Sequence, residues 1–257
     1  MNPTVVAVIT FCFAFGGALL GMWLATSARW RPLADDDKSK DTVKLAIGLV
    51  STMTALVLGL VTASAKSSYD QMDSAVKQAS INLLALDRVL ARYGPETKDI
   101  RAQLKAVAES RIGTMWPGGA SQPPAMARPA TSAPTTVEGL VDSIRGLGPG
   151  NELQSALKAR AVELAEDGLQ LRWLAVASAE TDVPAAFLVI VIFWLTVIFA
   201  SFGLYAPRNL AAMTALIVSS LSVACALFLV LELGSPFSGV ISVSDQPLLR
   251  ALGLMNG

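Results

Sequence analysis

The sequence predicts an all-α membrane protein with four transmembrane helices in two hairpins, separated by a soluble helical domain. Three observations lead to this prediction. The composition is apolar, with 53% hydrophobic and only 16% charged residues and a mean hydropathy of +0.53, which is high for a soluble domain. Four apolar runs, uncharged except for Glu232 near the end of the fourth, are long enough to cross a bilayer core, which takes about 20 helical residues. A long charged segment with helical periodicity lies between the second and third runs.

The predicted spans cover about residues 4–26, 45–65, 184–206 and 210–233. They divide the 257 residues into a first hairpin (1–65), a middle domain (66–183), a second hairpin (184–233) and a C-terminal tail (234–257). The first run could alternatively be a cleaved signal peptide. A signal peptide begins with a basic segment, however, and Met1-Asn2-Pro3 supplies no basic residue. We therefore expect a retained first span and a multi-pass protein of the bacterial inner (plasma) membrane.

A helical seam follows the second span. Its apolar side chains alternate at spacings of three and four residues, which places them on one face of a coiled-coil-like helix. No proline interrupts the chain between Thr42 and Gly94, so the second span should continue out of the membrane as one helix of about 50 residues. Gly94-Pro95 should end it. The seam consists of Tyr69, Met72, Val76, Ala79, Leu83, Leu86, Leu90 and Tyr93.

The rest of the middle domain should also be helical. Apolar periodicity predicts helices around residues 100–115 and 153–174, which should pack on the seam, and a short helix at 137–147. Residues 117–136 are rich in Pro, Ala, Ser, Thr and Gly, and their apolar content is too low to offset the entropy of ordering, so we expect a disordered loop. In the tail, Ser244 and Pro247 can begin a short amphipathic helix that lies against the membrane or the domain.

Basic residues near the spans predict the orientation, because the side richer in Lys and Arg usually faces the cytoplasm. The short loops on one side carry more of them than the flanks on the other. We therefore expect the middle domain and both termini on the non-cytoplasmic side. The first set is Arg29, Arg31, Lys38, Lys40, Lys44 and Arg208; the second is Lys66, Lys77, Arg172 and Arg250.

Small residues recur at helical spacing in the first two spans, where they let a second backbone approach closely. The simplest interpretation is packing between spans of one chain, and the alternative is a contact between copies. These helix-packing candidates are Gly17 and Gly21 in the first span, and Gly48, Thr52, Ala55, Gly59 and Ala63 in the second.

The second span also carries a candidate ion path. Three hydroxyl side chains and a leucine form roughly one stripe, and such a stripe could line a wet path for ions. In the simpler alternative, the hydroxyls bond back to carbonyls of their own helix and face neighbouring helices. The pore-lining candidates are Ser51, Thr54, Leu58 and Thr62.

Several function classes are disfavoured. The chain has no histidine, which removes the commonest general base and the commonest transition-metal ligand. Cys12 and Cys225 lie inside apolar runs, where cysteine usually acts as a small hydrophobe. Acidic and basic residues balance at 20 each, so no global field attracts nucleic acid. We expect no catalytic site, no cofactor, no metal and no nucleic-acid partner.

Four segments resemble an uncharacterised bacterial membrane family labelled bestrophin-like. They are residues 59–70 (GLVTASAKSSYD), 86–96 (LDRVLARYGPE), 193–209 (FWLTVIFASFGLYAPRN) and 236–239 (PFSG). The resemblance covers nearly the whole chain except the Pro/Ala/Ser-rich segment. The family usually has an aspartate after the Glu-Leu of the tail, whereas this chain has Gly234.

The label implies a distant similarity to bestrophins, which are oligomeric anion channels with four spans per subunit. No aromatic constriction of the bestrophin kind matches the second span, where only Leu56, Leu58 and Leu60 are candidates. The resemblance also implies a cytoplasmic middle domain, opposite to the basic-residue count, which we follow because it comes from this sequence.

Two functional hypotheses remain. The first is a homo-oligomeric, passive ion channel in which the second span and its extension surround a central axis. The alternative is a non-conducting membrane scaffold whose helical domain binds a partner protein, and the absence of charge from the candidate pore supports it. An enzyme is the least favoured class, because neither a histidine nor a recognisable nucleophile is present.

Overall fold

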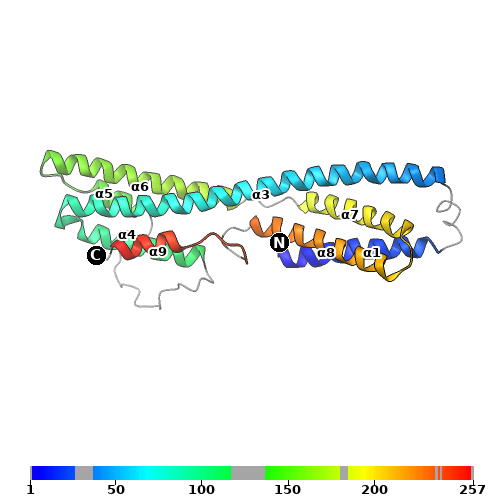
Figure 1. The fold of residues 1–257 in the computed structure, drawn as a ribbon. Helices are drawn as coiled ribbons and strands as arrows, with labels where there is room; N and C mark the ends of the chain where they lie inside the picture. The colour runs from blue at the N-terminus through cyan, green and yellow to red at the C-terminus, as the bar shows by residue number, and fades with distance from the viewer. Residues whose placement is uncertain are drawn as a thin grey trace. The chain divides into compact units, whose positions relative to one another are not determined.

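The computed structural model describes residues 2–26, 37–116, 137–179, 185–234, 237 and 239–255, and for 37–40 and 169–179 the backbone alone. All secondary structure in these ranges is helical, which confirms the predicted fold class. Figure 1 shows the helices in chain order. They are α1 (Pro3–Leu24), α3 (Asp37–Tyr93), the short 3-10 helix η1 (Pro95–Thr97), α4 (Lys98–Met115), α5 (Val137–Arg145), α6 (Glu152–Ala179), α7 (Ala185–Tyr205), α8 (Leu210–Leu233) and α9 (Gln246–Met255).

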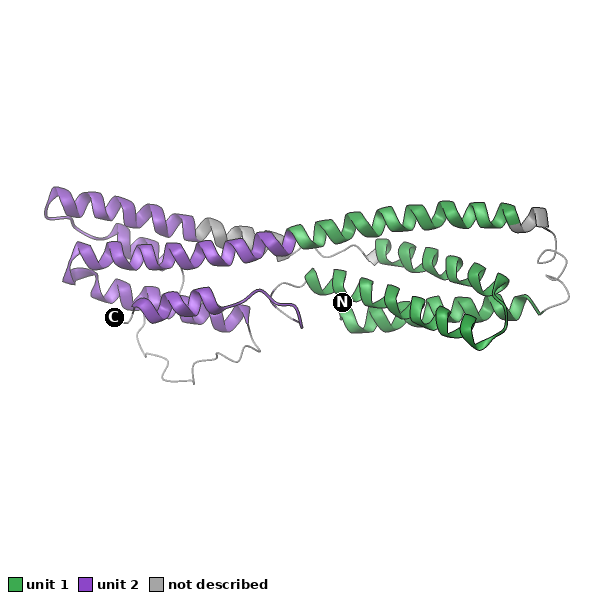
Figure 2. Ribbon diagram, in the orientation of Figure 1, with its two compact units in different colours: residues 1–67, 182–234 green, residues 68–181, 235–257 purple. Residues whose placement is uncertain are grey.

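The chain forms two compact units (Figure 2). Unit 1 comprises residues 1–67 and 182–234, and unit 2 comprises residues 68–181 and 235–257. Within the described residues, four helices are long and apolar enough to cross a membrane, namely α1, α3, α7 and α8. Unit 1 therefore holds the apolar part of every candidate span, and the predicted boundaries at 65/66 and 183/184 lie close to those of the units.

The α3 helix begins at Asp37, before the predicted membrane border at Leu45. No proline or glycine interrupts residues 37–44, so the local sequence allows the helix to start before the membrane border. The helix ends at Tyr93 because Gly94 takes a φ of 143° and Pro95 follows. With 57 residues, α3 is the long helix that the sequence predicts, and it contributes to both units.

Two capped helices frame unit 1. The Asn2 side chain accepts a hydrogen bond from the Thr4 N–H at the start of α1, and Pro3 occupies the first turn. The Asn209 side chain does the same for the Ala212 N–H at the start of α8. These caps satisfy N–H groups that a helix leaves without partners, and they position both helices to pack on each other and on α7.

Glycines bring α1 and α7 into close contact. A Cβ added to Gly17 would lie 2.7 Å from the Thr196 carbonyl oxygen, and one added to Gly21 would overlap the Ala200 carbonyl oxygen. From the other side, a Cβ on Gly203 would overlap the Ala18 carbonyl oxygen. The two backbones therefore meet directly, and in lipid such close packing, rather than a hydrophobic effect, holds helices together.

The seam of α3 lies in the core of unit 2. Met72, Val76, Leu86 and Leu90 are buried there with Ile100 and Leu104 of α4 and Ile144 of α5. Tyr69 and Leu83 pack against this core, and Tyr93 is buried at the end of the seam. Ala161, Leu164 and Ala165 bring α6 onto the same core.

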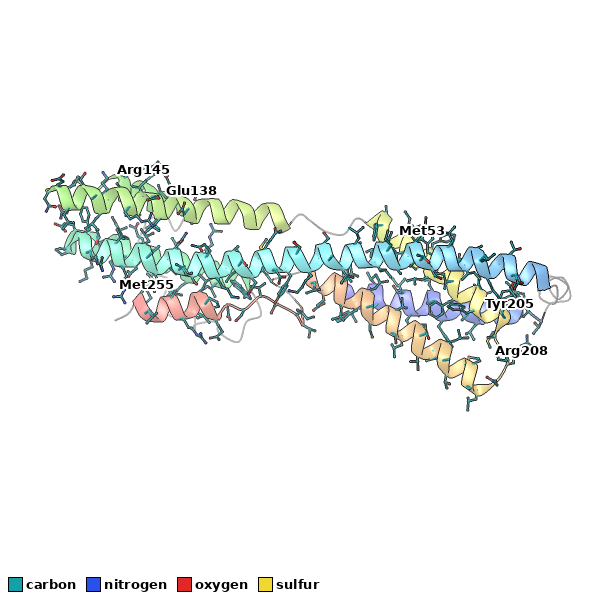
Figure 3. All side chains as sticks on the ribbon, turned by 45° about the horizontal axis from the view of Figure 1, so that its top comes forward. Met53, Glu138, Arg145, Tyr205, Arg208 and Met255 are labelled. Atoms are coloured by element: carbon teal, nitrogen blue, oxygen red, sulfur yellow. The ribbon has the colours of Figure 1, made fainter. Side chains whose placement is uncertain are left out.

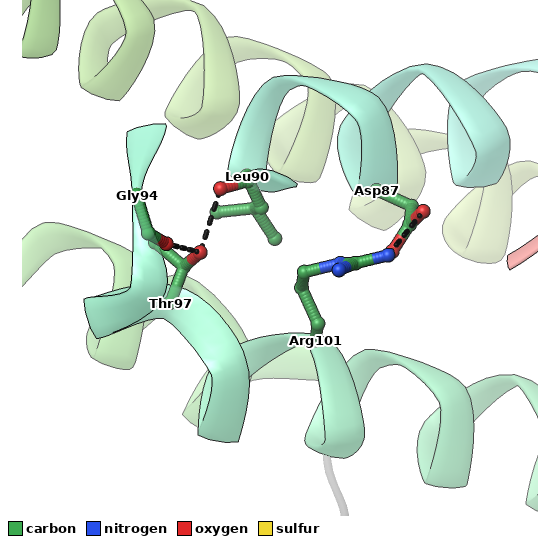
Figure 4. Close-up of polar contacts among 5 residues, drawn as sticks. All are labelled: Asp87, Leu90, Gly94, Thr97 and Arg101. Carbon is green, nitrogen blue, oxygen red and sulfur yellow. Dashed lines mark hydrogen bonds and ion pairs between the residues drawn. The ribbon is translucent and has the colours of Figure 1, made fainter. Parts of the chain in front are cut away.

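Two polar contacts fix the turn between α3 and α4 (Figure 4). The Thr97 hydroxyl donates to the carbonyl oxygens of Leu90, at 2.6 Å, and Gly94, at 2.8 Å. Between the two helices, the Arg101 guanidinium of α4 donates to both carboxylate oxygens of Asp87 in α3, at 2.7 and 3.0 Å. The Asp87 side chain is only 3% exposed, so this bidentate pair supplies the partner that a buried carboxylate needs.

The C-terminal tail docks on unit 2. The Trp116 indole N–H donates to the Val243 carbonyl oxygen at 2.7 Å. The rings of Trp116 and Phe237 pack edge to face, with their centroids 5.2 Å apart. The Ser244 hydroxyl accepts from the Gln246 N–H at the start of α9. Of the two predicted locations for this amphipathic helix, the structure shows the one against the domain. The predicted disordered loop at 117–136 lies outside the described residues.

The glycine contact gives the first prediction. We expect Gly21→Ala to force α1 away from α7, because the new methyl group overlaps backbone that cannot move aside cheaply; overpacking of this kind costs about 1–3 kcal/mol. The thermal unfolding midpoint of the detergent-purified protein should fall. Gly16→Ala is the matched control, because a Cβ at Gly16 meets nothing within 4 Å. An equal midpoint for the two variants would contradict the close contact.

The buried ion pair gives the second prediction. Asp87→Asn should destabilise unit 2 by about 1–3 kcal/mol, the typical cost of losing a charge-assisted hydrogen bond, with the cost reduced because Arg101 can reach water. The hydrogen bond to Asp87 raises the pKa of Arg101, so the stabilisation is complete below the ordinary guanidinium pKa and is lost only above it. Unfolding midpoints should therefore differ between variant and wild type by the same amount at pH 6 and pH 9. Asp73→Asn, which removes the exposed pair with Lys77, is the control and should leave the midpoint unchanged.

Candidate functional site

The membrane half of α3 has one face that packs within unit 1. Thr54 is 3% exposed on this face, and Val57 and Leu58 pack against a cluster of Leu188, Val191, Leu195 and Leu227 from α7 and α8. Val50 and Val61 lie half-buried on the same side. This face is the only part of the span that contacts its own unit among the described residues.

A second face of α3 is apolar and exposed. Its side chains are large, and more than half of the surface of each is uncovered. Met53, which Figure 3 labels on α3, is one of them. The set and the exposed fractions are Leu45 at 76%, Leu49 at 62%, Met53 at 54%, Leu56 at 67% and Leu60 at 65%.

The third face of α3 carries the predicted small residues. Gly48, Ala55, Gly59 and Ala63 are all exposed, and a Cβ added to Gly48 or Gly59 would meet nothing within 4 Å. Gly17 and Gly21 of α1, by contrast, lie directly against α7. Both sets of small residues recur at helical spacing, but of the two only the set in α1 packs directly against another helix inside unit 1.

The structure places the predicted hydroxyl stripe mostly on the packed side of α3. The Thr54 hydroxyl donates to the Val50 carbonyl oxygen at 2.7 Å, and the Thr62 hydroxyl donates to the Leu58 carbonyl oxygen at 2.7 Å. Ser51 is half-buried, and Thr62 is exposed. Thr54 and Leu58 thus face helices of their own unit, as the simpler alternative in the sequence had it, and Thr62 lies on the outer side.

The opposite side of the helix follows from its geometry. At about 100° per residue, Thr52, Leu56, Gly59 and Ala63 lie diametrically across α3 from the packed face of Thr54 and its neighbours. All four are exposed. This line, which we call the outer line, runs along the border between the leucine face and the small-residue face. The sequence pattern marks Thr52, Gly59 and Ala63 as helix-packing candidates and Leu56 as a constriction candidate, but it does not show which way they face until the packed face is known.

One end of unit 1 is held by Arg208, in the connection between α7 and α8 (Figure 3). Its guanidinium donates to the Met22 carbonyl oxygen at 2.8 Å, which caps the last turn of α1. Trp23 is 64% exposed nearby and lines a shallow, open groove with Arg208.

Glu232 is a buried acid in unit 1. An acid at the end of a span is expected to reach water, yet this residue is only 3% exposed at the end of α8. Nothing in the local sequence indicates this burial, which depends on tertiary packing. Within the part of the chain that the structure describes, no cluster of three or more His, Cys, Asp or Glu side chains could hold a metal ion.

Comparison with known proteins connects this architecture to a family. A family model described as a Bestrophin-like domain matches residues 12–248. No curated protein matches the sequence. A solved variant of a bacterial bestrophin homologue from Klebsiella pneumoniae has a TM-score of 0.67 at 17% identity, with 96% of this chain and 99% of that chain covered.

Two further structures have the same fold. A variant described only as a membrane protein gives a TM-score of 0.66 at 17% identity, covering 96% of this chain and 98% of that chain. Another variant of the Klebsiella pneumoniae homologue gives 0.63 at 17% identity, covering 94% and 98%. At this identity the similarity shows a shared fold along nearly the whole chain.

Proposed function

This chain belongs to the bestrophin-like family of membrane proteins, and from that premise we propose that copies of it assemble around a passive path for small anions in the bacterial inner membrane. The α3 helices of the copies surround the axis, and the outer line faces it. The solved structures with the same fold, named as bestrophin homologues, support this proposal.

The observation that carries the proposal is how little of α3 its own chain covers. Only 6% of its most apolar stretch is buried, whereas the corresponding stretches of α1, α7 and α8 are 39%, 33% and 28% buried. Lipid tails can cover the leucine face of α3. A seam of glycine and alanine, by contrast, offers few side-chain atoms for contact with lipid. A seam of that kind favours close contact with another helix, and further copies of α3 supply one.

The outer line would give the path an apolar lining. Leu56 is the largest side chain on this line, and no charged residue occurs between Lys44 and Lys66. Apolar constrictions conduct when wet and close by expelling water. We therefore assign the narrowest point to Leu56 and attribute the choice of anions to the family similarity rather than to a charged ring.

Ion flux tests this proposal. Protein reconstituted in liposomes loaded with chloride should release it, and Leu56→Trp should lower the rate by at least about tenfold because the indole fills a narrow apolar path. Leu221→Trp is the matched control: Leu221 is 52% exposed on α8, away from the outer line, and its variant should conduct as the wild type does. Thr54→Val, which removes a hydroxyl on the packed face, should also conduct normally. Wild-type liposomes that retain chloride at every pH and with every anion would contradict the proposal.

A non-conducting scaffold is the second candidate, favoured by apolar side chains on the surface of unit 2. Leu153 is 69% exposed and Ile81 is 60% exposed, and exposed apolar surface is typical of protein-binding regions when it is contiguous. If liposomes show no flux, crosslinking from Leu153 should capture a protein other than this chain. Capture of copies alone would exclude the scaffold.

Orientation forms a separate part of the proposal. The basic residues near the spans favour a non-cytoplasmic unit 2. Alkaline phosphatase fused after Gly257 should therefore be active, since it folds only outside the cytoplasm, and a fluorescent reporter that matures only inside should stay dark. The opposite pair of results would place unit 2 in the cytoplasm and leave the proposed anion path unaffected.

A further inference from the structure

Unit 2 contains an apolar cavity of about 180 Å³ within its helical core. Its wall is formed by α3, α4, α5 and α6 with contributions from Phe237 and Leu248. Leu86, Leu104, Leu140 and Leu164 are among the lining residues and are all buried. An engineered apolar cavity of about 150 Å³ in another protein binds benzene, so this space can hold a ligand with on the order of six to eight carbon atoms.

The cavity wall has one charged group, and it is a cation. Every lining residue is apolar or glycine except Asn82 and Arg111, and no acid is among them. The Asn82 carboxamide oxygen already accepts a hydrogen bond from Gln78 at 2.9 Å. Arg111 is a half-buried residue, and its guanidinium has no hydrogen-bond or ion-pair partner among the residues that the structure describes.

These features specify the ligand chemistry. The atoms that line an empty apolar chamber lack dispersion contacts on one side. A hydrocarbon that fills the chamber restores these contacts, so the chamber favours an apolar ligand. A guanidinium on a wall that contains no acid favours a single carboxylate, which it can bind through two parallel hydrogen bonds. We propose that this cavity is a binding site for a medium-chain fatty acid, with the hydrocarbon chain in the apolar chamber and the carboxylate on Arg111.

The site is independent of the proposed anion path, since all of its residues belong to unit 2 and its occupancy can be measured without flux. The probe is radiolabelled octanoate, equilibrated by dialysis against the full chain in lipid nanodiscs and against empty nanodiscs. The protein-containing nanodiscs should bind about one additional octanoate per chain. Equal uptake by empty and protein-containing nanodiscs would overturn the proposal.

Paired variants locate the ligand. Arg111→Gln should weaken octanoate binding by about tenfold and leave 1-octanol binding unchanged, because only octanoate carries the charge. Arg88→Gln, an exposed arginine of α3 outside the cavity wall, should change neither. If Arg111→Gln weakens both ligands equally, or neither, Arg111 is not the carboxylate partner.

Filling the chamber should block both ligands. Gly168 lines the cavity, and a Cβ added there meets nothing within 4 Å, so Gly168→Leu should abolish octanoate and 1-octanol binding. Gly113→Leu is the matched control: this exposed helical glycine of α4 also has free space but does not line the cavity. Ala79→Leu, at another lining position, is the second filling variant if the first unfolds. Undiminished binding in a folded filling variant would overturn the assignment.

Discussion

One helix, α3, has to satisfy two environments, and the rest of the structure depends on how it does so. Its first half is an apolar span of which only one face, around Thr54 and Val57, is covered by its own unit. Its second half is amphipathic, and its seam forms the core of unit 2. Because the backbone hydrogen bonds along a helix are internal to it except at its ends, the same element is stable in lipid and in water. What differs between the halves is what covers the side chains.

Different interactions hold the helices together in the two units. In unit 1 the glycines of α1 and α7 allow backbone contact, and the Arg208 side chain caps the end of α1. In unit 2 the hydrophobic effect drives the seam onto α4, α5 and α6, and the buried Asp87 carboxylate is paired with Arg101. The uncovered faces of α3 follow from this division, because α1, α7 and α8 pack against one another and α7 and α8 cover a single side of α3.

The fold was predictable from the sequence, since run length, periodicity and proline or glycine breaks act locally. The range of α8 agrees with the predicted span, and Gly94-Pro95 ends α3 where it should. The candidate site was less predictable. Small residues recur at helical spacing in both α1 and α3, and only tertiary contacts show that Gly17 and Gly21 are covered while Gly48 and Gly59 are not. The burial of Thr54 and Glu232, and the docking of the tail through Trp116, likewise depend on segments distant in the sequence.

The central claim is that the small-residue face of α3 meets the same helix of another copy. Crosslinking in native membranes tests it most directly, with Cys12 and Cys225 replaced by alanine and one cysteine introduced into α3. A short bifunctional maleimide should link copies of the Gly59→Cys chain, because Gly59 is exposed, and should not link the Val57→Cys chain, because Val57 packs inside unit 1. Monomers from Gly59→Cys and Gly48→Cys alike, in protein that remains folded, would contradict the account.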